Sequence, residues 1–273
     1  IWNAFRLIKG WTVDDNIQAP DAAKLAVHWF ESKQNEVAAE VADLFSKYRL
    51  SEALMAVYKL FWDEFSSWYL EMIKPAYGQG IDRTTYSATL CFLDNLLHLL
   101  HPFMPFITEE LWQQMYERNA EEGESLMVSA LSMDTYVDTA FVAQFEVVKG
   151  VISNIRSIRL QKNIAQKEPL DLQVLGENPV AEFNAVIQKM CNLSSITVVE
   201  SKAEGASSFM VGTTEYAVPL GNMIDVEAEI ARMEAELKHK EGFLQGVLKK
   251  LSNEKFVNNA PAAVLEMERK KQA

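Results

Sequence analysis

Apolar residues recur at helical spacing through much of the first half of the chain. Between residues 82 and 101 they form a face so broad that little polar surface remains: Leu90, Phe92, Leu93, Leu96, Leu97, Leu99 and Leu100. This pattern predicts a helix in the centre of a bundle. Pro102 and Pro105 lack a backbone donor and disfavour helical geometry before them, so the chain must turn there. Thr108 is then expected to cap a second helix, which completes a helical hairpin.

Two longer helices are expected before this hairpin. The first begins after Pro20 and continues to residue 46, and the second covers residues 51–72. The second helix carries large apolar side chains that we expect in the core: Leu54, Val57, Tyr58, Phe61, Phe65 and Trp68. Antiparallel packing suits such helices, so residues 1–136 are predicted to form a helical bundle.

The hydrophobic period changes from helical to strand-like beyond Pro169. The helix before this change starts near Asp138 and has one apolar face: Val148, Val151, Ile155 and Ile158. Alternation then predicts strands and one helix, in this order: strand 170–174, helix 179–190, strand 196–199 and two strands within 208–218. Residues 137–221 are therefore predicted to form a small α+β domain.

A heptad pattern occupies residues 222–273. Its core positions alternate in spacing between four and three residues: Val226, Ile230, Met233, Leu237, Lys240, Leu244, Val247 and Leu251. Residues 253–259 form the expected turn, and Pro261 starts a second helix. We predict an antiparallel coiled-coil hairpin with a truncated second arm. The predicted fold class is mainly α, with a bundle, a small α+β domain and this arm.

The charge of the chain restricts its possible partners. The formal net charge is −12 over 273 residues, whereas a general nucleic-acid binder is usually basic. Any RNA contact must therefore be local, and no DNA partner is expected. One stretch, residues 149–167, holds five basic residues and no acid: Lys149, Arg156, Arg159, Lys162 and Lys167.

Cysteine usage and hydropathy indicate the cellular setting. Cys91 and Cys191 lie far apart and form neither a disulfide framework nor a zinc spacing, which favours a reducing, cytoplasmic environment. No apolar run approaches the roughly 20 residues of a membrane span, so no membrane partner is expected. The chain starts at Ile1 without a methionine, which suggests a piece of a longer polypeptide. We expect a monomer.

Three strings carry a resemblance to a known family: HPFMPFITEELW at residues 101–112, IWNAFR at 1–6 and FWDEFSSWYLEMIK at 61–74. Together they resemble the anticodon-binding helical domain of class I aminoacyl-tRNA synthetases for branched aliphatic amino acids. The domain order, with NEKFVNNAP at residues 253–261, is similar to the C-terminal part of bacterial valyl-tRNA synthetases. Isoleucyl and leucyl enzymes share the bundle but not this arm, and they remain an alternative.

The resemblance implies recognition of the anticodon and stem of valine tRNA, tRNA(Val), for the ATP-dependent aminoacylation performed by a valine–tRNA ligase. The family's His-x-Gly-His signature and Lys-Met-Ser-Lys-Ser loop are absent from the sequence. This part alone is therefore expected to hold no catalytic residue, metal or cofactor, with ATP and Mg in a missing catalytic domain. The alternative from another class is a helical protein-interaction scaffold whose heptads bind a partner helix.

Eight basic residues are the candidates for tRNA contact: Arg6, Lys24, Arg156, Arg159, Lys162, Lys167, Lys249 and Lys250. The resemblance places Arg6 on the helix that approaches the anticodon, where a guanidinium can form forked hydrogen bonds to RNA. A salt bridge across the bundle is the alternative for Arg6. The resemblance places Arg156 and Arg159 at the start of the domain that touches the tRNA stem, and the helical spacing predicts that their basic face is free.

Several aromatic residues could also stack on unpaired bases. Trp29 lies in the first long helix, and Trp62, Phe65, Trp68 and Tyr69 lie in the second. Aromatic residues at helical spacing are more often part of a core, so burial is the favoured interpretation for all five.

Overall fold

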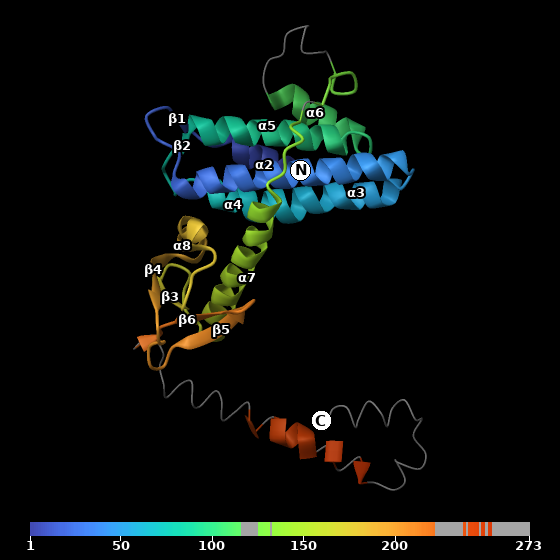
Figure 1. Ribbon diagram of the computed structural model, residues 1–273. Coiled ribbons are helices and arrows are strands. Elements are labelled where there is room, and N and C mark those ends of the chain that lie inside the picture. Colours follow the sequence, from blue (N-terminus) through green and yellow to red (C-terminus); the bar gives the residue numbers. More distant parts are fainter. Residues whose placement is uncertain are drawn as a thin grey trace. The chain divides into compact units, whose positions relative to one another are not determined.

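The structure is a computed structural model, and it describes residues 1–115, 125–131, 133–221, 237–238, 240–245, 247–248 and 251–252. Its contacts divide the chain into two compact units, 1–219 and 220–273. The described part is mainly helical, with two small sheets (Figure 1). No described helix is long and apolar enough to cross a membrane.

The first part of the larger unit is a bundle of antiparallel helices, as predicted (Figure 1). Its α-helices are α1 (Trp2–Lys9), α2 (Asp21–Ser46), α3 (Leu50–Lys59), α4 (Leu70–Ile73), α5 (Arg83–Leu100) and α6 (Pro105–Met115). A cluster of buried rings from α2, α5 and the segment between α3 and α4 forms the centre, where Phe30 lies 5.2 Å from Phe65 and 5.2 Å from Phe92 between ring centroids. Two short parallel strands, β1 (Val13–Asp14) and β2 (Ile81–Asp82), join the loops at one end.

A π-helical segment, η1 (Leu60–Tyr69), continues α3 into α4. Its wider turn changes the spacing of the buried positions, so Phe61, Phe65 and Tyr69 face the core. Trp62 is 55% exposed and stacks on Tyr58, which is 52% exposed, with ring planes 7° apart. The prediction that both rings lie in the core is wrong, because Tyr58 and Trp62, four residues apart, each lie one position beyond a buried residue, Val57 or Phe61, on the outer face of the helix.

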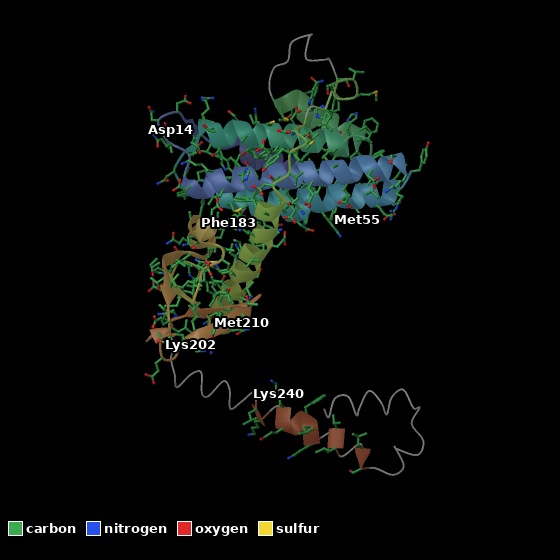
Figure 2. All side chains as sticks on the ribbon, in the orientation of Figure 1. Asp14, Met55, Phe183, Lys202, Met210 and Lys240 are labelled. Atoms are coloured by element: carbon green, nitrogen blue, oxygen red, sulfur yellow. The ribbon has the colours of Figure 1, made fainter. Side chains whose placement is uncertain are left out.

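The position of Leu54 differs from the prediction for a second reason. Leu54 is 38% exposed, whereas its small neighbour Ala53 is fully buried against the bundle. The close approach of α2 and α3 favours a small side chain at the contact, so the larger residue lies outside it. Met55, labelled on the outer side of α3 in Figure 2, is also exposed.

The hairpin between α5 and α6 turns where the two prolines predict. However, α6 begins at Pro105, so the prediction that Thr108 caps it is wrong. Proline suits the first turn of a helix because its missing N–H would have no intrahelical partner there. The Thr108 hydroxyl instead donates to the backbone oxygen of Met104 at 2.9 Å, inside the helix.

The second part of the larger unit consists of one long helix, a four-stranded sheet and a short helix. Its elements are α7 (Thr139–Gln161), β3 (Leu170–Leu175), η3 (Ala181–Phe183), α8 (Asn184–Cys191), β4 (Leu193–Val199), β5 (Ser207–Val211) and β6 (Thr214–Val218). The strand order is β4-β3-β6-β5, with β3 parallel to β4 and antiparallel to β6. The predicted strands and helices are confirmed.

Helix α7 connects the bundle to this sheet (Figure 1). Its predicted apolar face is buried, and Gly150 lets the helix approach β5, since a Cβ there would lie 3.0 Å from a methyl group of Val211. Phe183, labelled in Figure 2, packs against Phe141 and Phe145 of α7. Contacts of α8 with α2 and α4 complete the junction, so one compact unit contains both the bundle and the α+β part.

The smaller unit is described at only a few positions. Residues 240–245 are helical, and Val247 is 3% exposed. The turn at 253–259 and the second arm from Pro261 lie outside the described residues, so the coiled-coil hairpin remains a prediction.

Candidate nucleic-acid interface

Two predicted contact residues lie on the bundle, on separate helices. Arg6 is exposed on α1, and no described residue forms an ion pair or hydrogen bond with its guanidinium. The alternative of a salt bridge for Arg6 therefore has no partner in the described part of the chain. Lys24 on α2 is 62% exposed and pairs with Asp21 at 3.0 Å, an exposed pair that water screens strongly.

The exposed guanidinium of Arg156 lies on α7, over the ring of Trp68. The distance from the guanidinium carbon to the ring centroid is 5.6 Å, within the range of a cation–π contact. Trp68 belongs to η1, so this contact joins α7 to the bundle. The guanidinium carbon lies over the ring, and the N–H groups remain able to bind an anion.

A surface cavity of about 420 Å³ adjoins Arg156. It is lined by residues of the end of α7 and of the following loop: Arg156, Arg159, Leu160, Asn163, Ile164, Ala165 and Gln166. Lys162 ends α7 and is partly exposed, and Lys167 is exposed on the loop. The structure thus brings four of the eight predicted residues to one end of α7.

Arg159 does not share the free basic face that the helical spacing predicts. Its side chain is 1% exposed, and its guanidinium donates to the backbone oxygens of Ala165 at 2.9 Å and Cys191 at 2.7 Å. Burial lowers the pKa of Arg159 from its usual range. The prediction of an exposed Arg159 is wrong, because carbonyls from two later segments surround it.

Lys149, the first cation of the basic stretch, is also a structural residue. Its ammonium nitrogen lies 2.6 Å from Glu64 on η1 and 2.8 Å from Glu146 on α7. It also lies 5.3 Å from the ring centroid of Trp29, which is fully buried as expected, and 5.8 Å from that of Trp68. Glu64, distant in sequence, and Glu146, three residues before Lys149, therefore neutralise the first cation of a stretch that contains no acid of its own.

Two asparagines with left-handed backbones shape the loop after α7. Asn163 has φ 53° at the end of α7, where the N–H of Ile164 bonds to the oxygen of Arg159 at 2.8 Å. Asparagine tolerates this conformation better than most residues and commonly ends helices in this way. Asn192 has φ 51° after α8, and its side-chain amide donates to the oxygens of Gln166 and Lys167.

The sequence-based reasoning did not identify Trp68 and Asn192 as parts of this site. An asparagine within two residues of the end of a predicted helix is a recognised signal for a left-handed cap, so Asn192 could have been found. The pairing of Trp68 with Arg156 has no such local signal, because the two residues lie on separate elements. Lys249 and Lys250 lie outside the described residues.

Comparison with known proteins identifies two matching family models. Residues 27–174 match the anticodon-binding domain of tRNA ligase, and residues 225–273 match the valyl tRNA synthetase tRNA binding arm. Curated relatives named valine–tRNA ligase align over the whole chain, with 99% identity in Bacteroides thetaiotaomicron, 71% in Phocaeicola vulgatus and 35% in Enterococcus faecalis.

The chain spans 31% of the length of the first two of these relatives and 32% of the third. The first family model covers more than half of the chain, and the second covers its end. The first match covers most of the bundle, all of α7 and all but the last residue of β3. The chain belongs to the family of tRNA-ligase anticodon-binding domains and resembles the C-terminal region of valyl-tRNA synthetases.

Proposed function

We propose that this chain is the tRNA-recognising part of a valine–tRNA ligase. The bundle contacts the anticodon of valine tRNA through Arg6 and Lys24, and the end of α7 contacts the stem through Arg156, Lys162 and Lys167. The observation that carries the proposal is the exposed guanidinium of Arg156, fixed on Trp68 beside a lysine-bearing loop in an acidic protein. The shared name of the relatives supports valine over isoleucine or leucine.

The part played by these residues is binding and orientation. Arg156 and the two lysines provide cations for phosphates, which position an RNA without reading its sequence. Contacts far from the reacting atoms place the acceptor end of the tRNA at a catalytic domain outside this chain, where ATP and Mg would support aminoacylation. We assign no cofactor to the residues present, and we expect a cytoplasmic monomer.

Residues 222–273 would act as an antiparallel coiled-coil arm against the same tRNA. The match to a tRNA binding arm supports this role. Lys249 and Lys250 are the residues through which we expect the arm to contact the RNA backbone.

The test is binding of the chain to valine tRNA at two salt concentrations, beside a valine tRNA with an altered anticodon and an unrelated tRNA. We expect affinity that falls steeply with salt, as phosphate contacts require, and that is weaker for the two control RNAs. Equal affinity for all three RNAs would contradict anticodon recognition. Absence of binding to any of them would contradict the proposal as a whole.

A further inference from the structure

The loop at residues 163–169, between α7 and β3, is held by two side chains that lie outside it. Arg159 donates to the backbone oxygen of Ala165 at 2.9 Å. The side-chain amide of Asn192 donates to the next two backbone oxygens, those of Gln166 at 3.2 Å and Lys167 at 2.9 Å. Three consecutive carbonyl groups of the loop are therefore bound to α7 and to the end of α8.

The two side chains are themselves connected. A terminal nitrogen of the Arg159 guanidinium donates to the backbone oxygens of Cys191 at 2.7 Å and Asn192 at 3.3 Å. The oxygen of Asn192 also accepts the N–H of Leu170, the first residue of β3, at 3.2 Å. The end of α7, the loop, the end of α8 and the start of β3 thus form one hydrogen-bonded network.

This network holds the backbone of Lys167 while its side chain remains exposed. A loop ordered before binding avoids the loss of backbone freedom that a flexible loop suffers when RNA binds. Asn192 carries no charge, so its contribution to RNA affinity would be independent of salt. A lysine that binds a phosphate contributes to affinity in a salt-dependent way, because binding releases counterions. The two roles can therefore be separated experimentally.

We propose that Asn192 is a positioning residue for RNA binding, which holds the loop so that Lys167 meets a backbone phosphate. Arg159 supports it from inside the fold and makes no RNA contact of its own. This inference rests on the proposed function, and it assigns a role to a neutral residue in a different element from the basic stretch.

The matched pair of variants is Asn192→Gly and Asn163→Gly. Both asparagines have left-handed backbones, which glycine adopts without strain, but only the Asn192 side chain bonds to the loop carbonyls. Affinity for valine tRNA is measured for both across a salt series, together with Lys167→Ala.

We expect Asn192→Gly to weaken binding about fivefold at every salt concentration, the effect of one or two lost hydrogen bonds. The slope of log affinity against log salt should not change. Lys167→Ala should weaken binding and reduce that slope by about one, and Asn163→Gly should bind like the unsubstituted chain. Amide hydrogen exchange of residues 163–169 should be faster in Asn192→Gly than in Asn163→Gly, which checks the loop without RNA.

Three outcomes would overturn the inference. Equal RNA affinity of the two glycine variants, with tRNA still bound, would show that the Asn192 amide is not needed. A salt slope for Asn192→Gly that falls as it does for Lys167→Ala would mean that the phosphate contact of Lys167 is lost altogether, which contradicts a role limited to ordering the loop before binding. Equal hydrogen exchange in the two variants would mean that the amide does not order the loop. Failure of the unsubstituted chain to bind tRNA would instead contradict the proposed function, and this inference with it.

Discussion

Arg156 and Trp68 form a contact between two parts of one compact unit, with the guanidinium carbon 5.6 Å from the ring centroid. Because the ring supports a cation that remains exposed, we expect Arg156 to bind one RNA phosphate. Arg156→Ala should weaken binding of valine tRNA and reduce the slope of log affinity against log salt by about one. A salt titration of binding measures both quantities.

The control for this prediction is Lys47→Ala. Lys47 follows the last residue of α2, is 55% exposed and pairs with Asp43. Its replacement by alanine removes one positive charge, as Arg156→Ala does. We expect Lys47→Ala to leave the salt slope unchanged. If both variants change the slope equally, overall charge and not a local contact governs binding.

Lys149→Met should destabilise the fold. The substitution keeps an unbranched apolar chain among Trp29, Trp68 and Phe145, but it leaves Glu64, 17% exposed, without its 2.6 Å partner. Removing one partner of a buried ion pair lowers the free energy of unfolding by about 3 kcal/mol. Urea unfolding measures this change. The double variant Lys149→Met with Glu64→Gln should recover most of the lost free energy of unfolding. If the effects of the two single substitutions simply add, Lys149 and Glu64 are not energetically coupled.

Arg159→Met and Arg156→Met form a second matched pair on one helix. Arg159 is 1% exposed and donates to three backbone oxygens, so its loss should lower the free energy of unfolding by about 3 kcal/mol. Arg156 is exposed and loses only a ring contact, so its substitution should cost about 1 kcal/mol or less. Coincident denaturation curves for the two variants would contradict the different roles assigned to Arg159 and Arg156.

Asp138, which precedes α7 and pairs with His28 of α2, should make the stability of the fold depend on pH. The backbone N–H of Phe141 at 3.0 Å and then His28 at 3.3 Å hold the pKa of Asp138 below its usual range. Since the folded-state pKa is depressed, the stabilisation is present above the unfolded pKa of about 3.9 and is lost as pH falls through the folded value. Asp138→Ala should therefore be less stable than the unsubstituted chain at pH 7, with a difference that shrinks below about pH 4.

The measurement for Asp138 is the urea midpoint of both proteins from pH 7 to pH 2. Asp63→Ala, at an exposed position of η1, serves as the control and should show a much smaller difference at pH 7. A difference for Asp138→Ala that is constant over the whole pH range would contradict the ionic origin of the effect.

Much of the fold follows from hydrophobic period, because it reflects which face of each element is buried. The face of α7 with Val148, Val151 and Ile155 is confirmed, and so are the strands after Pro169. The errors in α3 and η1 concern neighbouring positions: Ala53 and Val57 are buried, whereas Leu54, Tyr58 and Trp62 are exposed at intervals of four residues. Hydrophobic period does not separate these two faces, because both carry apolar side chains.

The site was harder to predict because the charges near a residue in the sequence do not show which groups surround it in the folded protein. Lys149 and Arg159 look like surface cations in a stretch without acids, yet Glu64 neutralises one and backbone oxygens near residue 191 surround the other. Their partners lie 85 and 32 residues away in sequence. Only the tertiary contacts separate these structural cations from Arg156, which remains exposed.

Helix α7 also determines the distance between the bundle and the loop at residues 163–169. It is anchored at Asp138 by His28 and at Arg159 by the loop network, and its 23 residues span about 34 Å at 1.5 Å per residue. A rigid helix anchored at both ends fixes the distance between these two ends. Inserting one residue between the anchors would rotate the loop by about 100° and advance it by about 1.5 Å. Inserting seven would nearly restore the orientation but shift the loop by about 10 Å, so under the proposed function the length of α7 would set the distance between the RNA contacts of the bundle and those of the loop.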